Sequence, residues 1–290
     1  MKGSKSFWET IGELLKTNKL AIFLEIAMVI LPFWGGVLLN GRIGNDHISL
    51  GGNLILLGGP IVYLGLAVSL FLLWSATRLR GAGWGYFGLI PQKGWLRPVM
   101  LTLGVALVTL AAVKTVINPI INAIPAWGVP DLSRFDYLNG DLPNLIIQLV
   151  VIWLTAGFLE EFIFRGYLIN RLTDLFSGRF QLAWVLALVA QAVIFGLVHA
   201  YQSPVGMFKV GVIGLAFGLS YLAIDRNLWP LIIAHGLIDS LDMVSHYFVG
   251  NEPELFTNSC YAVQDYKSLT QTGKYLKCGQ DFCSLPRRSA

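Results

Sequence analysis

Residues 143–164 read PNLIIQLVVIWLTAGFLEEFIF, an apolar run whose only charged residues are the adjacent Glu160 and Glu161. A helix needs about 20 apolar residues to cross about 30 Å of hydrocarbon, so this run is long enough to span a membrane. An ionisable side chain inside a span costs about 2.5–3.5 kcal/mol on membrane-insertion scales, so each glutamate needs a partner or a function. The run therefore predicts both a membrane fold and the position of a site.

The composition of the whole chain agrees with a membrane fold. The 290 residues are 55% hydrophobic and 13% charged, and the mean hydropathy is +0.63. A soluble domain is about 25% charged and a disordered chain has low hydrophobicity, so both classes are excluded for most of the length. The net charge of +4 is spread between apolar runs rather than along a basic stripe, so no nucleic-acid partner is expected. We predict an all-α fold, a polytopic transmembrane helical bundle.

Seven apolar runs divide the chain, and we expect seven spanning helices, with eight as the alternative. Pro60 is expected to kink the second helix, and Pro119, Pro125 and Pro130 predict a loop or a re-entrant segment after the third. The approximate limits of the runs are 20–39, 54–76, 98–118, 143–164, 181–200, 208–224 and 229–249.

The distribution of basic residues orients these helices. Basic residues are enriched in cytoplasmic loops, so the more basic side, which includes the N-terminus, is expected to be cytoplasmic in the plasma membrane of a prokaryote. That side would hold Lys2, Lys5, Lys16, Lys19, Arg78, Arg80, Lys93, Arg97, Arg165, Arg171, Arg179 and Arg226, and the other side Arg42 and Arg134.

Three segments are expected. Residues 1–19 form an amphipathic cytoplasmic surface helix, in which Ser6 and Glu9 have capping-box spacing. Residues 20–250 form the membrane domain, with its motifs within 143–249. Residues 251–290 form a polar, weakly structured tail, which holds Cys260, Cys278 and Cys283. Three cysteines allow at most one disulfide, and their spacing fits no zinc motif.

The acidic pair in the fourth run divides into two roles. Glu161 and Arg165 are four residues apart on one helix face, so they can form an ion pair that serves only structure. Glu160 is turned about 100° from Glu161 by the helical period. A buried glutamate without a full partner suits a general base, so Glu160 is the functional candidate. Glu25, in the first run, is expected to snorkel or to pair locally.

His199, at the end of the fifth run, shares a helix face with Phe195. If the fourth and fifth runs form an antiparallel hairpin, residues at equal height have a constant index sum. The sum for Glu160 and His199 places the turn near 179–180, where Ser177 and Gly178 are turn residues. The two side chains are therefore expected at the same height on neighbouring helices.

His235 and Asp239 in the seventh run have the i, i+4 spacing of an oriented imidazole. Asp242 and His246 repeat this spacing nearer the helix end. The alternative is a polar stripe that faces the bundle interior. His235 lies about 12 Å along its helix from the preceding turn, whereas His199 ends its own helix, so their proximity requires tilt, a broken sixth helix or long side chains.

The three motifs, in this order, resemble the CPBP family, the CAAX-protease and bacteriocin-processing membrane proteases also called the Abi family. That family is marked by EExxxR, FxxxH and HxxxN or HxxxD on successive helices. The resemblance covers about residues 80–245 and includes FGLIP at Phe87–Pro91. Here the motifs are Glu160-Glu161-Phe-Ile-Phe-Arg165, Phe195-Gly-Leu-Val-His199 and His235-Gly-Leu-Ile-Asp239.

The resemblance implies an intramembrane endopeptidase and a role for each residue. Glu160 would activate a water together with His199, while Glu161 would pair with Arg165. His235 and Asp239 would polarise the scissile carbonyl or stabilise the oxyanion. The prenyl-protein-processing branch prefers Asn where this chain has Asp239. An ionised Asp cannot donate a hydrogen bond, so Asp239 would orient His235 or be protonated.

Cofactor and substrate stay open at this point. Glu160, His199 and His235 form a two-His, one-carboxylate zinc set with room for water, and metal dependence is slightly favoured over a metal-free Glu/His mechanism. The substrate would be a prenylated C-terminus, a bacteriocin leader or a membrane-anchored protein, met in the lipid bilayer. The rival readings are a non-enzymatic immunity or peptide-binding protein and a proton-coupled transporter. The sequence does not indicate an oligomeric state.

Overall fold

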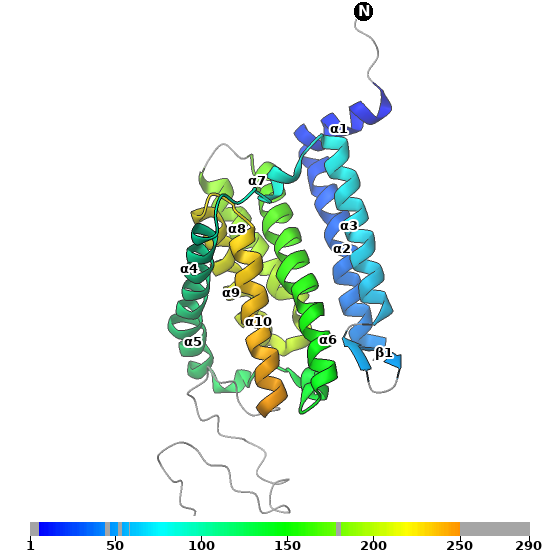
Figure 1. Cartoon of the computed structure of the whole chain (residues 1–290). Helices are drawn as coiled ribbons and strands as arrows, with labels where there is room; N and C mark the ends of the chain where they lie inside the picture. The colour runs from blue at the N-terminus through cyan, green and yellow to red at the C-terminus, as the bar shows by residue number, and fades with distance from the viewer. Residues whose placement is uncertain (1–5, 44–46, 52–53, 58, 178–180, 250–290) are drawn as a thin grey trace, which may run out of the picture. The chain divides into compact units, whose positions relative to one another are not determined.

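The structure is a computed structural model, and it describes residues 6–43, 47–51, 54–57, 59–177 and 181–249 (Figure 1). These residues belong to the unit Met1–Glu254. The predicted tail 251–290 with its three cysteines, and Lys2, Lys5 and Arg179, lie outside the described residues. The division of the chain at residues 19 and 250 stays a prediction.

A short helix, α1 (Phe7–Thr17), opens the described chain where the surface helix is predicted. The backbone N–H of Ser6 donates to the Glu9 carboxylate at 2.9 Å, which completes one half of a capping box. Phe7 and Trp8 are exposed, whereas Leu15 is buried, and α1 packs on α3 (Pro60–Arg80). The exposed aromatic pair has the chemistry of a membrane-surface anchor.

Helix α2 (Lys19–Ile43) lies beside α3 (Figure 1). A hairpin of β1 (His47–Gly51) and β2 (Leu54–Leu57) joins them, and its strands pair antiparallel. The all-α prediction is therefore confirmed for the described residues apart from this one hairpin. The predicted start of the second run at residue 54 is wrong, because residues 54–57 form β2.

Pro60 begins α3 and does not kink it. At the first position of a helix the backbone N–H makes no intrahelical hydrogen bond, so a proline there loses none. The fixed φ of proline also matches the helical value. The predicted kink is therefore wrong, and the helix runs uninterrupted to Arg80. Gly81 follows it in the left-handed conformation, with φ 68°, which is a common helix end.

The third span is longer than the sequence predicts. The span consists of α4 (Leu96–Ala112), η2 (Val113–Ile117) and α5 (Asn118–Ala123). A 3₁₀ turn, η1 (Trp84–Phe87), precedes it. Pro119 lies inside this helix instead of ending it, immediately after the π-helical turn η2, because a local π turn accommodates a proline in a helix. The predicted loop begins only after Ala123, and it contains the 3₁₀ turns η3 (Pro125–Trp127) and η4 (Ser133–Leu138).

The motif-bearing part of the chain consists of helices joined by short turns where it is described. The three motifs lie on η5, at the end of α8 and on α10. The elements are α6 (Leu142–Ile152), the π-helix η5 (Trp153–Ile169), α7 (Asn170–Leu175), α8 (Gln181–Val198), η6 (Ala200–Gln202), α9 (Ser203–Ala223) and α10 (Trp229–Val249).

Six helices among the described residues are long and apolar enough to cross a membrane, which confirms a polytopic helical fold. The seventh predicted run forms α10, which has 21 residues. Helix α10 carries two histidines and two aspartates, and it is not among the six candidate spans. The six candidate spans are Lys19–Asn40, Pro60–Arg80, Leu96–Ala123, Leu142–Leu175, Gln181–Val198 and Ala200–Ala223.

Candidate functional site

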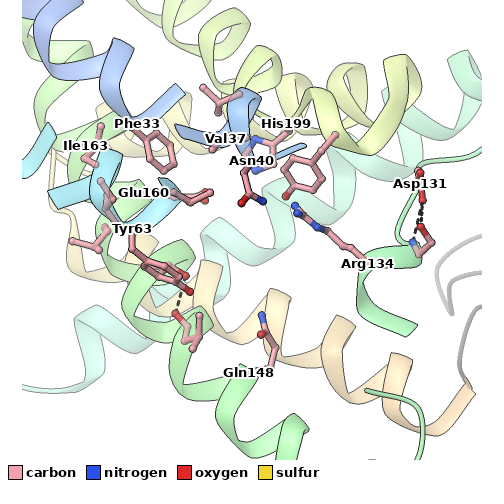
Figure 2. Close-up of a pocket in the computed structure, with 18 residues that line it drawn as sticks. Phe33, Val37, Asn40, Tyr63, Asp131, Arg134, Gln148, Glu160, Ile163 and His199 are labelled. Atoms are coloured by element: carbon pink, nitrogen blue, oxygen red, sulfur yellow. Dashed lines mark hydrogen bonds between the residues drawn. The ribbon is translucent and has the colours of Figure 1, made fainter. Parts of the chain in front are cut away.

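A cavity of about 400 Å³ brings Glu160 and His199 together (Figure 2). Its wall is built from α2, α3, α6, η5, the end of α8 and the loop before α6. Figure 2 shows Glu160 pointing into this space between Phe33 and Tyr63. The helical-hairpin register thus predicts correctly that Glu160 and His199 face a common region, although part of the turn, residues 178–180, lies outside the described residues.

His199 stands where α8 ends, with its ring held in one orientation. Its Nδ1 lies 2.8 Å from the backbone oxygen of Phe195. A carbonyl oxygen only accepts hydrogen bonds, so Nδ1 carries the hydrogen in this contact and Nε2 is the ring nitrogen with a lone pair. A half-buried imidazole that presents an acceptor at a cavity can bind a water or take up a proton.

Glu161 points away from the cavity and into a fully buried ion pair. Its Oε1 accepts a hydrogen bond from Arg165 Nη1 at 2.7 Å, and both side chains are completely buried. The predicted pair is therefore present. The same oxygen lies 2.7 Å from His235 Nδ1, so one carboxylate joins η5 to α10.

Arg165 is also held by aromatic rings. Its guanidinium carbon lies 4.4 Å from the ring centre of Phe195 and 5.2 Å from that of Phe217. Its Nη2 donates to the backbone oxygen of Gly214 at 3.3 Å. These contacts connect η5 with α8 and α9. Burial strengthens the cation–π contacts, because water is excluded from them. Phe195 additionally contacts the His199 ring, with 4.9 Å between ring centres.

His235 lies between two carboxylates. Its Nδ1 faces Glu161, and its Nε2 lies 3.5 Å from Asp239 Oδ2. The i, i+4 spacing therefore places Asp239 where it can orient His235, one of the two predicted roles. Among the described residues that line the cavity, neither His235 nor Asp239 is found. The motifs thus form two layers, with Glu160 and His199 at the cavity and the other five motif residues behind them.

Two glycines allow α10 to approach η5 closely enough for this arrangement. A Cβ on Gly157 would lie 3.4 Å from Gly236 Cα, and a Cβ on Gly236 would lie 2.8 Å from the Trp153 ring. Larger side chains would force the helices apart, because packed interiors have little spare volume. This close approach brings His235 to Glu161.

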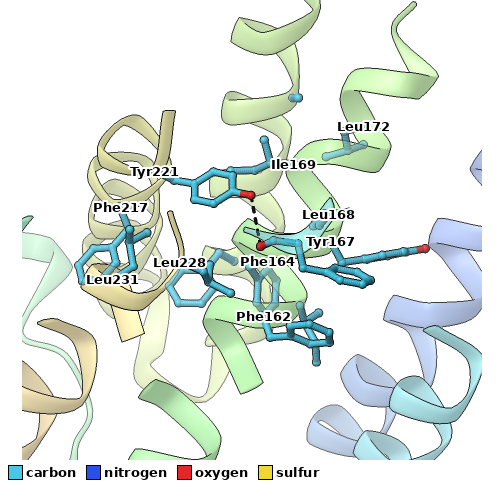
Figure 3. Packing of buried hydrophobic residues seen from close by; sticks show 14 of the residues in the cluster. Phe162, Phe164, Tyr167, Leu168, Ile169, Leu172, Phe217, Tyr221, Leu228 and Leu231 are labelled. Carbon is cyan, nitrogen blue, oxygen red and sulfur yellow. Dashed lines mark hydrogen bonds between the residues drawn. The ribbon is translucent and has the colours of Figure 1, made fainter. Parts of the chain in front are cut away.

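The second half of η5 is the most buried helix segment of the site. Residues 161–170 are all buried, and Phe162, Phe164 and Tyr167 pack into a core with α9 and with Leu228 at the start of α10 (Figure 3). A wholly buried helix is apolar on every face, which explains why this run shows no amphipathic period. The packing fixes the height and rotation of the acidic pair.

The acidic pair lies in a π-helix rather than in the α-helix that the sequence predicts. A π-helix is wider, so each residue turns by less than the 100° of an α-helix, and such segments are frequent at functional sites. The rotation between Glu160 and Glu161 still separates them, since Glu160 faces the cavity and Glu161 the buried ion pair.

A second cavity of about 390 Å³ lies between α3, η1 and η5. Aromatic and aliphatic side chains dominate its wall, among them Leu73, Trp84, Phe158 and Phe162. Leu159 lines both cavities. An apolar space thus adjoins the cavity that holds Glu160.

A buried ionic cluster that the sequence analysis missed connects α2 and α3 to η5 and α7. Glu25 accepts from Arg171 Nη2 at 2.7 Å and from the Tyr167 hydroxyl at 3.0 Å, and Arg80 Nη2 lies 3.3 Å away. Glu25 neither snorkels nor pairs locally, because it is 2% exposed and its partners are distant in sequence. Its signal in the sequence is an acidic residue within an apolar run.

The predicted zinc set does not fit the arrangement of these side chains. Both ring nitrogens of His235 face carboxylates, so this histidine would have to release one of them to bind a metal. Among the described residues, no group of three or more His, Cys, Asp or Glu side chains is arranged to hold a metal ion. The geometry instead suits hydrogen bonding and proton transfer.

Comparison with known proteins gives one match. Residues 142–241 match the family model described as type II CAAX prenyl endopeptidase Rce1-like. This segment runs from the start of α6 into α10 and contains all three motifs. No curated protein and no solved structure matches the chain.

Proposed function

We propose that this chain hydrolyses a peptide bond of a prenylated C-terminal peptide. The proposal follows from its membership, through residues 142–241, of the type II CAAX prenyl endopeptidase Rce1-like family. The family is one of membrane proteases, and the helices of this chain are those of an integral multi-pass membrane protein. One observation carries the assignment of the site: Glu160 and His199, from different helices, line one cavity, while the neighbouring Glu161 is neutralised by Arg165.

Glu160 acts as the general base in this proposal. It takes a proton from a water held between its carboxylate and His199 Nε2, and the water oxygen attacks the carbonyl carbon of the peptide bond. The proton then passes to the nitrogen of the tetrahedral intermediate, the C–N bond breaks, and a carboxylate and an amine leave. The Phe195 carbonyl keeps His199 in the acceptor tautomer that this step requires.

The second layer holds the first in position. Arg165 and His235 both bind Glu161 Oε1, so the rotation of η5 is set by contacts with α8, α9 and α10. Asp239 orients His235 from the next helical turn. Polarisation of the substrate carbonyl by His235 would require its Nε2 to turn from Asp239 toward the cavity.

The apolar cavity supports a lipidated substrate. It shares Leu159 with the cavity of Glu160, so a hydrocarbon chain bound there would be next to a peptide at the catalytic pair. Burial of apolar surface contributes about 25 cal/mol per Å², which is a substantial source of affinity for a prenyl group. A bacteriocin leader lacks such a group and would not use this space.

The test uses purified protein in detergent and mass spectrometry of the products. Wild type is incubated with a peptide that carries a C-terminal C-a-a-X sequence, with and without a prenylated cysteine. We expect cleavage of the prenylated form, and a loss of at least about 100-fold in Glu160→Gln. Glu13→Gln, at an exposed surface ion pair, is the matched control and should cleave normally.

Two outcomes would overturn the proposal. Full cleavage by Glu160→Gln would show that another group is the base. Binding without cleavage by folded wild type would favour the immunity or peptide-binding reading, and pH-coupled flux in liposomes would favour transport.

A further inference from the structure

A loop outside the matched segment contributes a basic residue to the catalytic cavity. Arg134, in η4, lines the cavity together with Glu160 and His199. Figure 2 shows its guanidinium pointing across the space toward Asn40 and His199. Among the described residues that line this cavity, Arg134 is the only lysine or arginine.

The loop that carries Arg134 is anchored on both sides. Phe135 and Leu138 are buried against Met243 of α10. The Asp131 N–H donates to the backbone oxygen of Gln202 at 3.1 Å, and the Gly140 N–H donates to that of Tyr247 at 3.0 Å. Arg134 is therefore presented from a packed segment, which positions a binding group better than a free loop does.

The Tyr201 ring contacts both Arg134 and the catalytic histidine. The His199 and Tyr201 ring centres are 5.7 Å apart, and Arg134 Cζ lies 4.1 Å from the centre of the Tyr201 ring. The sum of these two distances shows that the guanidinium carbon lies at most about 10 Å from the His199 ring centre. A guanidinium binds a carboxylate through the N–H groups in its plane.

Asp131 also lines the cavity, but its carboxylate is engaged by its own turn. Asp131 Oδ1 accepts from the hydroxyl of Ser133 at 2.7 Å and from the backbone N–H of Ser133 at 3.1 Å. These hydrogen bonds and, to a smaller extent, the charge of Arg134 lower the pKa of Asp131. Asp131 thus stays ionised, and Arg134 supplies the positive charge of this cavity wall.

We propose that Arg134 binds a substrate carboxylate within about three residues of the cleaved bond, and so selects the substrate end and the cleavage position. The proposal rests on the proposed hydrolysis at Glu160 and His199. An extended chain covers about 3.3–3.6 Å per residue, so a separation of at most about 10 Å sets an upper limit of about three residues. A C-a-a-X sequence has three residues after its cysteine. The carboxylate is either the chain terminus or an acidic side chain at that distance.

The experiment compares three prenylated peptides of equal length. One ends in a free carboxylate, one in an amide, and one in an amide preceded by Glu as the last residue. A hydrogen-bonded charge pair changes binding by about 10- to 100-fold. Wild type should therefore cleave at least one carboxylate-bearing peptide about 10- to 100-fold faster, in kcat/KM, than the plain amide, and the preferred peptide identifies the carboxylate.

Substitution of Arg134 should remove this discrimination. Arg134→Gln should lose far more kcat/KM on the preferred acid than on the amide, so that it cleaves the acid no faster than the amide. Arg134→Lys keeps the charge but loses the planar fork, so it should retain part of the preference; it also serves if the glutamine variant unfolds. Arg97→Gln, at an exposed ion pair with Asp225, is the matched control. The proposal would be overturned if wild type cleaved the acid and amide peptides with equal kcat/KM. It would also be overturned if Arg134→Gln lowered kcat/KM equally for both peptides.

Binding separates this proposal from the proposed chemistry. The dissociation constants of the three peptides are measured for Glu160→Gln and for the double variant with Arg134→Gln, by fluorescence anisotropy. An acid preference that disappears with Arg134 supports the carboxylate site even if wild type cleaves none of the peptides. Equal binding of acid and amide by Glu160→Gln overturns it even if cleavage by wild type is observed.

Discussion

His235 Nδ1 lies 2.7 Å from Glu161 Oε1, the same oxygen that accepts a hydrogen bond from Arg165 Nη1 at 2.7 Å. A histidine of α10 and an arginine of η5 thus share one carboxylate oxygen. The two motifs lie more than 70 residues apart in the sequence, and this contact makes them one unit. Its consequence is that Glu161 is used for structure, while Glu160 is left to face the cavity.

Removal of either member of the buried pair should strongly destabilise the fold. Glu161→Ala leaves the guanidinium of Arg165 buried without its carboxylate, and Arg165→Ala leaves the carboxylate without its guanidinium; each should cost about 3–5 kcal/mol. The double variant should lose less than the sum, because the two singles remove the same interaction. Thermal unfolding in detergent measures all three, with Glu13→Gln as control. Additive losses would contradict a direct coupling.

The positions of the helices were predictable from the sequence, because uninterrupted apolar length is a strong local signal. Their ends were less predictable. Leu54–Leu57 is apolar like a span but forms β2, since a short apolar run fits a strand as well as a helix. Pro119 continues a helix after a π turn, a device that leaves no mark in the hydropathy.

The site was predictable only as far as neighbouring helices determine it. The helical-hairpin register predicts that Glu160 and His199 meet, because one turn fixes both heights. The contact of His235 with Glu161 depends on the packing of Gly157 against Gly236, which no local period encodes. Arg134 reaches the cavity from a loop that is anchored by tertiary contacts, so the sequence alone gives it no distinguishing signal.

Chelation should leave the activity intact. His235 would have to give up a carboxylate partner to bind zinc, and hydrolysis by Glu160 and His199 needs only proton transfer. Cleavage of the prenylated peptide is measured after prolonged incubation with phenanthroline and with EDTA. An unchanged rate is expected. Loss of cleavage that added zinc restores would contradict the metal-free mechanism and return His235 to the ligand role.

Filling the apolar cavity should weaken binding of lipidated substrates alone. Gly83 lines that cavity at φ −101°, and a Cβ there meets no heavy atom within 4 Å. Gly83→Leu should therefore fold normally and raise KM for a prenylated peptide at least about tenfold, by the loss of apolar contacts. Gly85→Leu is the matched control, because Gly85 also has open space and is outside the cavity lining. Equal KM values for the two variants would place the prenyl group elsewhere.

The most direct test of the account is a kinetic cycle at Glu160 and His199. The single-turnover rate of one cleaved peptide is measured for wild type, Glu160→Gln, His199→Gln and the double variant, at equal thermal stability. Groups that act as a unit on one water give grossly non-additive losses. We predict losses of about 10²–10⁴-fold in each single variant and a double variant no slower than the slower single. Multiplicative losses, or a full rate in Glu160→Gln, would contradict the claim that the two residues activate one water.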